Sequence, residues 1–151
     1  MKRLVVLFMM AGVLLGVSCK KEALEASNPQ FDALVTSSLG GQWKFKGYSD
    51  GKIPAYDVSL EFKNEEGKLA INGRSSVNFY FATTEIDEVK KTLKVVSLGT
   101  TKIGGDKEAT DFEMNYYDRL RNVERYELKD KSELILYVSN PTKETLYFER
   151  K

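Results

Sequence analysis

Apolar and polar residues alternate along several short stretches of this 151-residue chain, and that alternation constrains its fold more than any other feature. In "QWKFKGY", Trp43 and Phe45 stand between a glutamine and lysines, and "VSLEF" repeats the pattern with Val58, Leu60 and Phe62. A period of two places apolar side chains on one face of a β-strand and polar ones on the other. Further β-rich stretches fall at residues 69–73, 76–83, 91–98, 124–130, 133–138 and 145–151. The chain is therefore predicted to consist mainly of short strands.

One segment, residues 110–123, breaks this rhythm and predicts a helix. Thr110, followed three residues later by Glu113, matches a capping box at a helix start. The apolar residues recur every three or four positions, as they do on one helical face; they are Phe112, Tyr116, Leu120 and Val123. Because strands and helices do not alternate, a doubly wound parallel sheet is excluded. We expect an α+β fold that is mainly β, a curved antiparallel sheet or partly open barrel with one packed α-helix.

The N-terminus carries the features of an export signal. Lys2 and Arg3 precede an apolar run over residues 4–15, and small residues lead to Cys19, the single cysteine of the chain. The run is shorter than the roughly 20 residues that a membrane-spanning helix needs, which favours a cleaved signal over a retained span. "LLGVSC" resembles the lipobox of bacterial lipoproteins, which implies that Cys19 is lipidated with acyl chains such as palmitate. An unmodified cysteine behind an ordinary signal peptide is the competing interpretation.

These features predict three parts: a signal peptide at 1–18, a lipid-anchored tether at 19–38 and a folded domain at 39–151. "KKEALEASNPQ", at residues 20–30, is polar and is typical of a linker. Lys20, rather than an aspartate, follows the anchor position, which favours the outer membrane of the cell envelope. The face of the membrane on which the domain lies stays open.

The composition excludes several kinds of chemistry. The chain has no histidine, and its one cysteine is assigned to lipid, so His-based triads, cysteine nucleophiles and common zinc sites are excluded. The formal charge of +1 becomes slightly negative once residues 1–18 are removed, which argues against nucleic acid as a partner. Acidic residues cluster at 65–66 and at 85–88, where solvated turns are the simpler interpretation. No catalytic residue, metal ligand or cofactor is predicted, and the protein is not expected to be an enzyme.

Three consecutive aromatic residues, Phe79, Tyr80 and Phe81, cannot all point to the same face of one strand. A strand covered on both faces would explain them, and so would a hydrophobic pocket inside a partly open barrel. Under the second explanation an apolar ligand would be lined by Trp43, Phe62, Phe79 and Phe81.

The order of motifs from residue 39 to residue 149 resembles the META, or HslJ-like, domain of bacterial envelope lipoproteins. "LGGQWKF" is similar to that family's opening strand, "INGRSSVNFYFAT" to the segment around its "GCN" motif, and "LGTTKIGGD" to its next motif. Val77 stands at the position of one cysteine that members have, and Gly105 stands near the position of a second, while Asn78 and Thr101 match. The resemblance implies structural hydrogen-bonding roles for Asn78 and Thr101 and a curved β-sheet with one helix.

Taken together, these features predict a non-enzymatic, lipid-anchored envelope protein that serves stress tolerance or interaction with an envelope protein partner. The folded domain is expected to be monomeric. The alternative is a binding module for a lipid or another apolar ligand in a lipocalin-like or split β-barrel. Lipocalin-like proteins also open with Gly-x-Trp, but they place their main helix after the barrel strands. In this chain the helix precedes the last strands, which favours the META resemblance.

Overall fold

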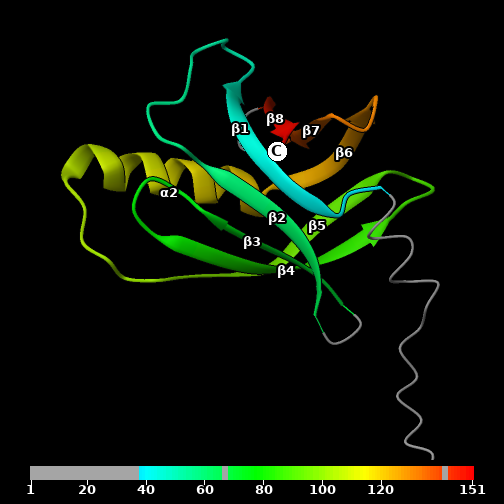
Figure 1. Cartoon of the computed structure of the whole chain (residues 1–151), viewed down its shortest axis with the longest axis horizontal. Helices are drawn as coiled ribbons and strands as arrows, with labels where there is room; N and C mark the ends of the chain where they lie inside the picture. Colours follow the sequence, from blue (N-terminus) through cyan, green and yellow to red (C-terminus); the bar gives the residue numbers. More distant parts are fainter. Residues whose placement is uncertain (1–37, 66–67, 141–142) are drawn as a thin grey trace, which may run out of the picture.

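A computed structural model describes residues 38–65, 68–140 and 143–151 (Figure 1). Cys19, the signal peptide and nearly all of the tether lie outside these residues. The elements follow one another as β1 (Gly41–Tyr48), β2 (Ser59–Glu65), β3 (Lys68–Arg74), β4 (Phe79–Asp87), β5 (Thr92–Thr100), α2 (Lys107–Arg121), β6 (Val123–Lys129), β7 (Glu133–Val138) and β8 (Glu144–Arg150). Each predicted strand and the predicted helix is present, with boundaries that differ by a few residues.

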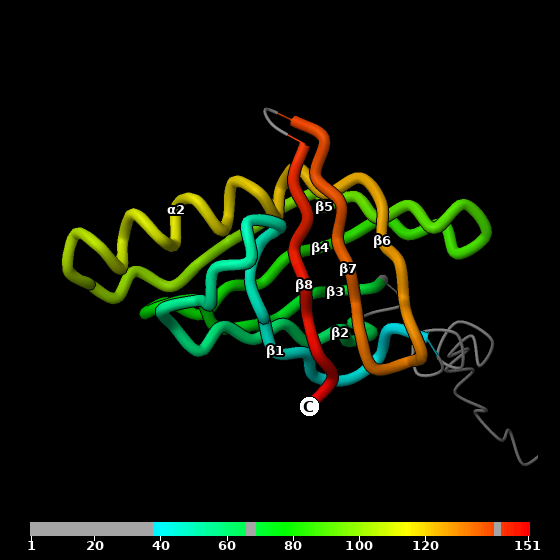
Figure 2. The backbone as a smooth tube through the Cα atoms, turned by 90° about the horizontal axis from the view of Figure 1, so that it is seen from above, coloured from blue at the N-terminus to red at the C-terminus, as the bar shows by residue number. Residues whose placement is uncertain are grey.

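The strands form a closed antiparallel barrel in sequence order (Figure 2). Each strand pairs with the next along the chain, and β8 returns to pair with β1 from Trp43–Arg150 to Tyr48–Leu146. The weakest junction is that between β5 and β6, whose one aligned pair is Thr92 with Arg125. The predicted mainly-β fold with one packed helix is confirmed for the described residues. The barrel is closed, and β5 and β6 diverge where α2 is inserted between them in the chain.

Arg150, on β8, fastens the start of the described chain to the end of the barrel. Its Nη1 donates to the carbonyl oxygen of Gly40 at 2.6 Å, and its guanidinium lies 4.2 Å from the centre of the Trp43 ring. Trp43 Nε1 in turn donates to the carbonyl oxygen of Leu39 at 2.9 Å. These contacts tie residues 39–43 to the end of β8.

The barrel interior is filled by large side chains. The alternation predicted for β1 and β2 holds, with Trp43 and Leu60 fully buried and Phe45 nearly so. Further inward side chains with almost no exposed surface come from β4, α2 and β6 to β8; they are Tyr80, Tyr116, Leu120, Tyr126, Leu134 and Phe148. Ring contacts join elements across this core, since Tyr116 lies 5.6 Å from Phe45 and 5.7 Å from Tyr80. An eight-stranded barrel has an interior just wide enough for such side chains.

The helix begins three residues earlier than predicted. Asp106 is the N-cap, and its carboxylate accepts a hydrogen bond from the backbone N–H of Ala109 at 2.8 Å. The capping box predicted from Thr110 and Glu113 is therefore wrong. Thr110 lies inside the first turn, where its hydroxyl donates to the carbonyl oxygen of Asp106. Asp106 is the cap because its short carboxylate, three residues before Ala109, can reach the backbone N–H of Ala109, which has no partner within the helix.

Candidate functional site

Glu113, which sequence reasoning assigned to a cap, is a buried hydrogen-bond acceptor between the helix and the segment before β4. Its Oε1 accepts from the backbone N–H of Val77 at 3.0 Å and of Asn78 at 2.6 Å. Its Oε2 accepts from Nδ2 of Asn78 at 2.7 Å. The side chain is 6% exposed, so these bonds lie almost out of water. Glu113 thus fixes the entrance to β4 against α2.

The environment keeps Glu113 ionised. Burial by itself raises the pKa of the carboxyl group, but hydrogen bonds from Asn78, Val77 and Ser76 outweigh it and hold the pKa below its ordinary value. A general acid near neutral pH needs the opposite shift. The geometry and the charge state both indicate a structural acceptor.

The structure brings Asn78 and Thr101 together in the same network. Oδ1 of Asn78 accepts from the Thr101 hydroxyl at 2.9 Å and from the backbone N–H of Ile103 at 2.7 Å. The Thr101 hydroxyl oxygen also accepts from the backbone N–H of Phe79 at 3.1 Å. Both polar atoms of the Asn78 side chain are therefore engaged, and the network ties β4, the segment after β5 and α2 together.

Val77 and Gly105, the two positions that correspond to cysteines in the resemblance, are neighbours in space. A Cβ atom added to Gly105 would lie 3.0 Å from Cγ2 of Val77. The pair lies beside the Asn78 network, so two thiols at these positions would face each other across the same junction.

The four aromatic residues predicted to line an apolar pocket do not share one. Trp43 and Phe62 lie inside the barrel, 0% and 3% exposed, whereas Phe79 and Phe81 lie on its outside, 56% and 59% exposed. Strand alternation explains the division, because Tyr80, between the last two, takes the inward position. The pocket prediction is thus corrected: the interior is occupied by side chains, and Phe79 and Phe81 face outward.

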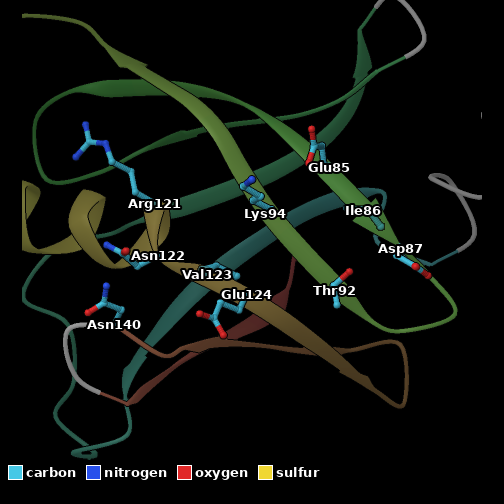
Figure 3. A pocket seen from close by; sticks show the side chains of 10 residues that line it. All are labelled: Glu85, Ile86, Asp87, Thr92, Lys94, Arg121, Asn122, Val123, Glu124 and Asn140. Carbon is cyan, nitrogen blue, oxygen red and sulfur yellow. The ribbon is translucent and has the colours of Figure 1, made fainter.

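The divergence of β5 from β6 opens a cleft on the barrel surface of about 600 Å³ (Figure 3). Its lining combines charges of both signs, uncharged polar groups and two apolar side chains: Glu85, Ile86, Asp87, Thr92, Lys94, Arg121, Asn122, Val123, Glu124 and Asn140. Such a lining suits a polar or charged partner better than a lipid chain. Sequence reasoning missed this cleft, because its residues come from β4, β5, β6 and the end of α2, and no local motif links them.

Asp87 in this cleft is already committed to a turn. Its Oδ1 accepts from the backbone N–H groups of Val89 and Lys90, both at 3.0 Å. The hydrogen bond from Lys90 is the main reason that the pKa of Asp87 lies below its ordinary value. Glu88, next in the chain, accepts from the hydroxyl of Ser38. Two of the three carboxylates at 85–88, those of Asp87 and Glu88, are therefore engaged in hydrogen bonds.

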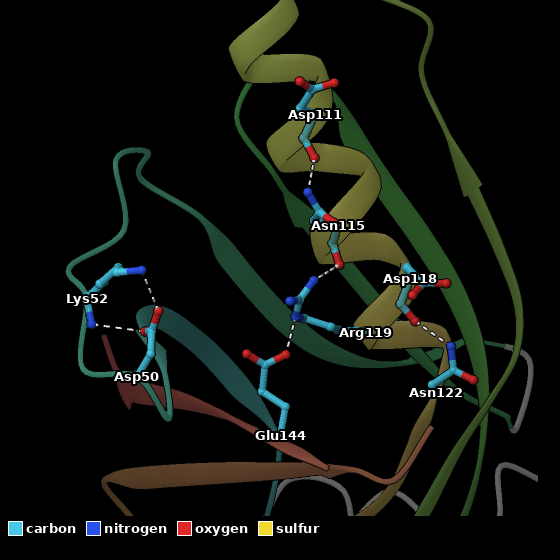
Figure 4. A network of polar contacts seen from close by, with 8 residues as sticks. All are labelled: Asp50, Lys52, Asp111, Asn115, Asp118, Arg119, Asn122 and Glu144. Carbon is cyan, nitrogen blue, oxygen red and sulfur yellow. Dashed lines mark hydrogen bonds and ion pairs between the residues drawn. The ribbon is translucent and has the colours of Figure 1, made fainter. Parts of the chain in front are cut away.

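A second polar cluster holds the C-terminal half of α2 against the barrel (Figure 4). Arg119 pairs with Glu144 at the start of β8, and its Nη1 donates to the carbonyl oxygen of Asn115 at 3.0 Å. The guanidinium also lies 4.7 Å from the centre of the Tyr48 ring. Burial raises the pKa of Tyr48 to about 12, partly opposed by the charge of Arg119. The cluster is a structural brace.

Two findings concern the described residues only. Within residues 38–65, 68–140 and 143–151, no group of three or more acidic, histidine or cysteine side chains could hold a metal ion. In the same ranges, no helix has both the length and the apolar character needed to cross a membrane.

Comparison with known proteins adds a family and a fold. The family model described as the META domain matches residues 34–151. A Burkholderia xenovorans protein solved by NMR has a TM-score of 0.60 at 19% identity, over 80% of this chain and 88% of that one. A Bacteroides vulgatus protein of the DUF4847 family has a TM-score of 0.54 at 15% identity, over 78% of this chain and 97% of that one. No curated protein matches the chain. Since the family model spans most of the sequence, the chain belongs to the META domain family.

Proposed function

We propose that this chain is a non-enzymatic, lipid-anchored protein of the bacterial envelope that binds a polar envelope protein through the cleft between β5 and β6. The observation that carries the proposal is the contrast between a filled barrel interior and an open, charged cleft on its surface. A barrel whose interior is packed with its own large side chains is expected to recognise other molecules on its outside. The role in envelope stress tolerance or protein interaction that is expected from the sequence fits such a site.

The lining of the cleft supports binding rather than catalysis. Lys94 and Arg121 supply positive charge, and Glu85 and Glu124 supply negative charge, so a partner with a complementary pattern gains specificity from several weak pairs. Oε2 of Glu124 already accepts from the Ser139 hydroxyl at 2.6 Å. No imidazole or thiol in the chain could join these groups in nucleophilic chemistry, because there is no histidine and the one cysteine is assigned to the anchor.

The anchor part of the proposal rests on Cys19 and the segment before it. A flexible linker of some 20 residues has an r.m.s. span of roughly 25 Å, so a tether as long as residues 19–38 would suffice to hold the barrel clear of lipid headgroups. Metabolic labelling with a fatty acid tests this part directly. We expect label in the parent and none in Cys19→Ser; equal labelling of both would contradict lipidation at Cys19.

Site-specific photocrosslinking in the cells that produce the protein tests the cleft. A photoreactive residue at Lys94 or at Glu124 should yield the same crosslinked partner, and one at Lys46, exposed on β1 away from the cleft, should not. Adding Arg121→Glu should weaken the crosslink from Lys94, because it reverses one charge of the lining. Equal crosslinking from all three positions, or none from the cleft, would remove the support for a partner at this site.

A further inference from the structure

A second hollow lies on the outside of the barrel across β2, β3 and β4, and it shares no residue with the cleft between β5 and β6. Strand register defines its two walls. One row of cross-strand neighbours runs Glu61, Asn72 and Phe81, and the next parallel row runs Ser59, Arg74 and Phe79. We call the space between them the outer groove; its volume is about 360 Å³.

The floor of the outer groove consists of backbone, because the residues between the two rows do not direct side chains to the outside of the barrel. Leu60, Gly73 and Tyr80 are the aligned residues between the two rows. Leu60 and Tyr80 are 0% and 2% exposed because they point into the barrel, and the glycine has no side chain. Backbone is thus left as the floor, and the flanking side chains stand above it as walls.

Two aromatic rings at one end of this groove are exposed without a covering layer. Phe79 and Phe81 are two residues apart on β4, so they lie on the same face, and each is more than half exposed. The Phe81 ring covers Gly99 on β5, where an added Cβ would lie 2.4 Å from it. Adjacent exposed aromatic residues on a soluble surface commonly mark a binding site.

The charged side chains that line the groove are Glu61, Arg74 and Lys151. Within the described ranges, neither the guanidinium of Arg74 nor the ammonium of Lys151 forms an ion pair, whereas Glu61 is paired with Lys63 at 3.1 Å. Asn72 uses its Nδ2 to donate to Glu65 at 2.9 Å. An acidic ligand would complement the two cations without a competing internal partner.

The chemistry of the groove favours one kind of occupant. An extended peptide cannot add a strand here, because β2, β3 and β4 are already paired on both sides. A bilayer would have to desolvate Glu61 and Asn72 beside the rings, which is unfavourable. A sugar ring has apolar C–H faces that pack against the electron-rich face of an aromatic ring, and hydroxyls that pair with amide, carboxylate and guanidinium groups. We propose that the outer groove binds a carbohydrate chain that carries carboxylate groups.

Cosedimentation of the full-length protein, purified in detergent, with insoluble polysaccharide beads tests this proposal. The beads carry polygalacturonate as the acidic probe or an uncharged glucan as the neutral probe, and anionic phospholipid vesicles form a third arm. We expect binding to polygalacturonate to be stronger than to the other two. Arg74→Gln and the double variant Phe79→Ser with Phe81→Ser should each weaken it by about tenfold or more.

Matched controls lie on the same molecule outside the groove. Lys129→Gln removes an exposed lysine from β6, and Val96→Ser replaces an exposed apolar residue of β5; both should bind like the parent. Circular dichroism and urea unfolding of every variant distinguish weaker binding at the groove from loss of the folded structure. Equal binding to the neutral glucan, preference for vesicles, no binding at all, or equal losses in folded control variants would each overturn the proposal.

Discussion

Replacing Glu113 with glutamine tests whether the buried network at the entrance to β4 stabilises the barrel. Glutamine keeps the shape and one acceptor oxygen, so the N–H groups of Val77 and Asn78 retain a partner, now uncharged. Each of these two bonds should weaken by about 1 kcal/mol. The bond from Nδ2 of Asn78 is replaced by two facing amide donors and is lost, at about 1 kcal/mol. Because an amide is less costly to bury than a carboxylate, the net destabilisation expected is about 2 kcal/mol.

Urea unfolding from pH 7 to pH 3 measures this effect and its dependence on ionisation. The pKa of Glu113 is lower in the folded state than its ordinary value, so its contribution is present above the unfolded pKa and is lost as pH falls through the folded pKa. The gap in unfolding free energy between parent and Glu113→Gln should therefore be largest near pH 7 and shrink below about pH 4. Glu85→Gln, an exposed carboxylate on β4, should change stability by less than about 0.5 kcal/mol. A Glu113→Gln protein as stable as the parent at pH 7 would refute the assigned role.

Three further predictions concern packing and ionisation. The double variant Val77→Cys with Gly105→Cys should form a disulfide under oxidising conditions. Because the bond closes a loop of roughly 28 residues, the unfolding free energy should rise by about 3 kcal/mol. Urea unfolding of the oxidised and reduced forms and of both single variants measures this rise, and no rise in the oxidised form would show that the geometry is unsuitable. Gly73→Ala should destabilise the fold by about 1–3 kcal/mol, because the added Cβ would lie 2.1 Å from the carbonyl oxygen of Ser59. Thermal unfolding measures this loss. Gly104→Ala is the control, since its Cβ would meet nothing within 4 Å. Burial raises the pKa of Tyr48, Tyr117 and Tyr126 to about 12. These tyrosines ionise more easily in the unfolded chain, so the unfolding free energy should fall as pH rises from about 10 to 12. Full tyrosinate absorbance in a protein that is still folded would contradict this.

Much of the fold is predictable from the sequence because strand alternation is a local property. Trp43, Phe45 and Leu60 are inward in the barrel for the same reason that they alternate with lysines and glutamate in the chain. Closure of the barrel is not local, since it depends on pairing between β1 and β8, whose residues lie about 100 positions apart. The predicted helix start is wrong because Thr110 matches a local capping pattern, whereas in the structure the carboxylate of Asp106 accepts the hydrogen bond from the backbone N–H of Ala109.

The site was less predictable than the fold, and Phe79 and Phe81 show why. Their hydrophobicity indicates burial, either in a strand covered on both faces or, under the other explanation, in an interior pocket with Trp43 and Phe62. Tyr80 takes the inward position on β4. Its hydroxyl donates to the carbonyl oxygen of Ser59 and also hydrogen-bonds to the hydroxyl of Tyr116. A tyrosine with two partners in the core leaves the neighbouring phenylalanines outside. The sequence contains no signal for this choice, because both partners come from other elements.

The residues that carry the META resemblance and those that could determine function lie in different parts of the barrel. Asn78 and Thr101 form hydrogen bonds with each other and with nearby backbone, and Asn78 also donates to Glu113. Substituting either residue should therefore lower the stability of the fold more than it affects ligand binding. Arg74 and Phe79, on the outside of the neighbouring strands, make no comparable side-chain hydrogen bonds or ion pairs within the described part of the chain. Substitutions at these two positions should therefore leave the stability of the barrel nearly unchanged. It follows that Asn78 and Thr101 report on the scaffold of this chain, and that its proposed ligand has to be tested at its outward-facing residues.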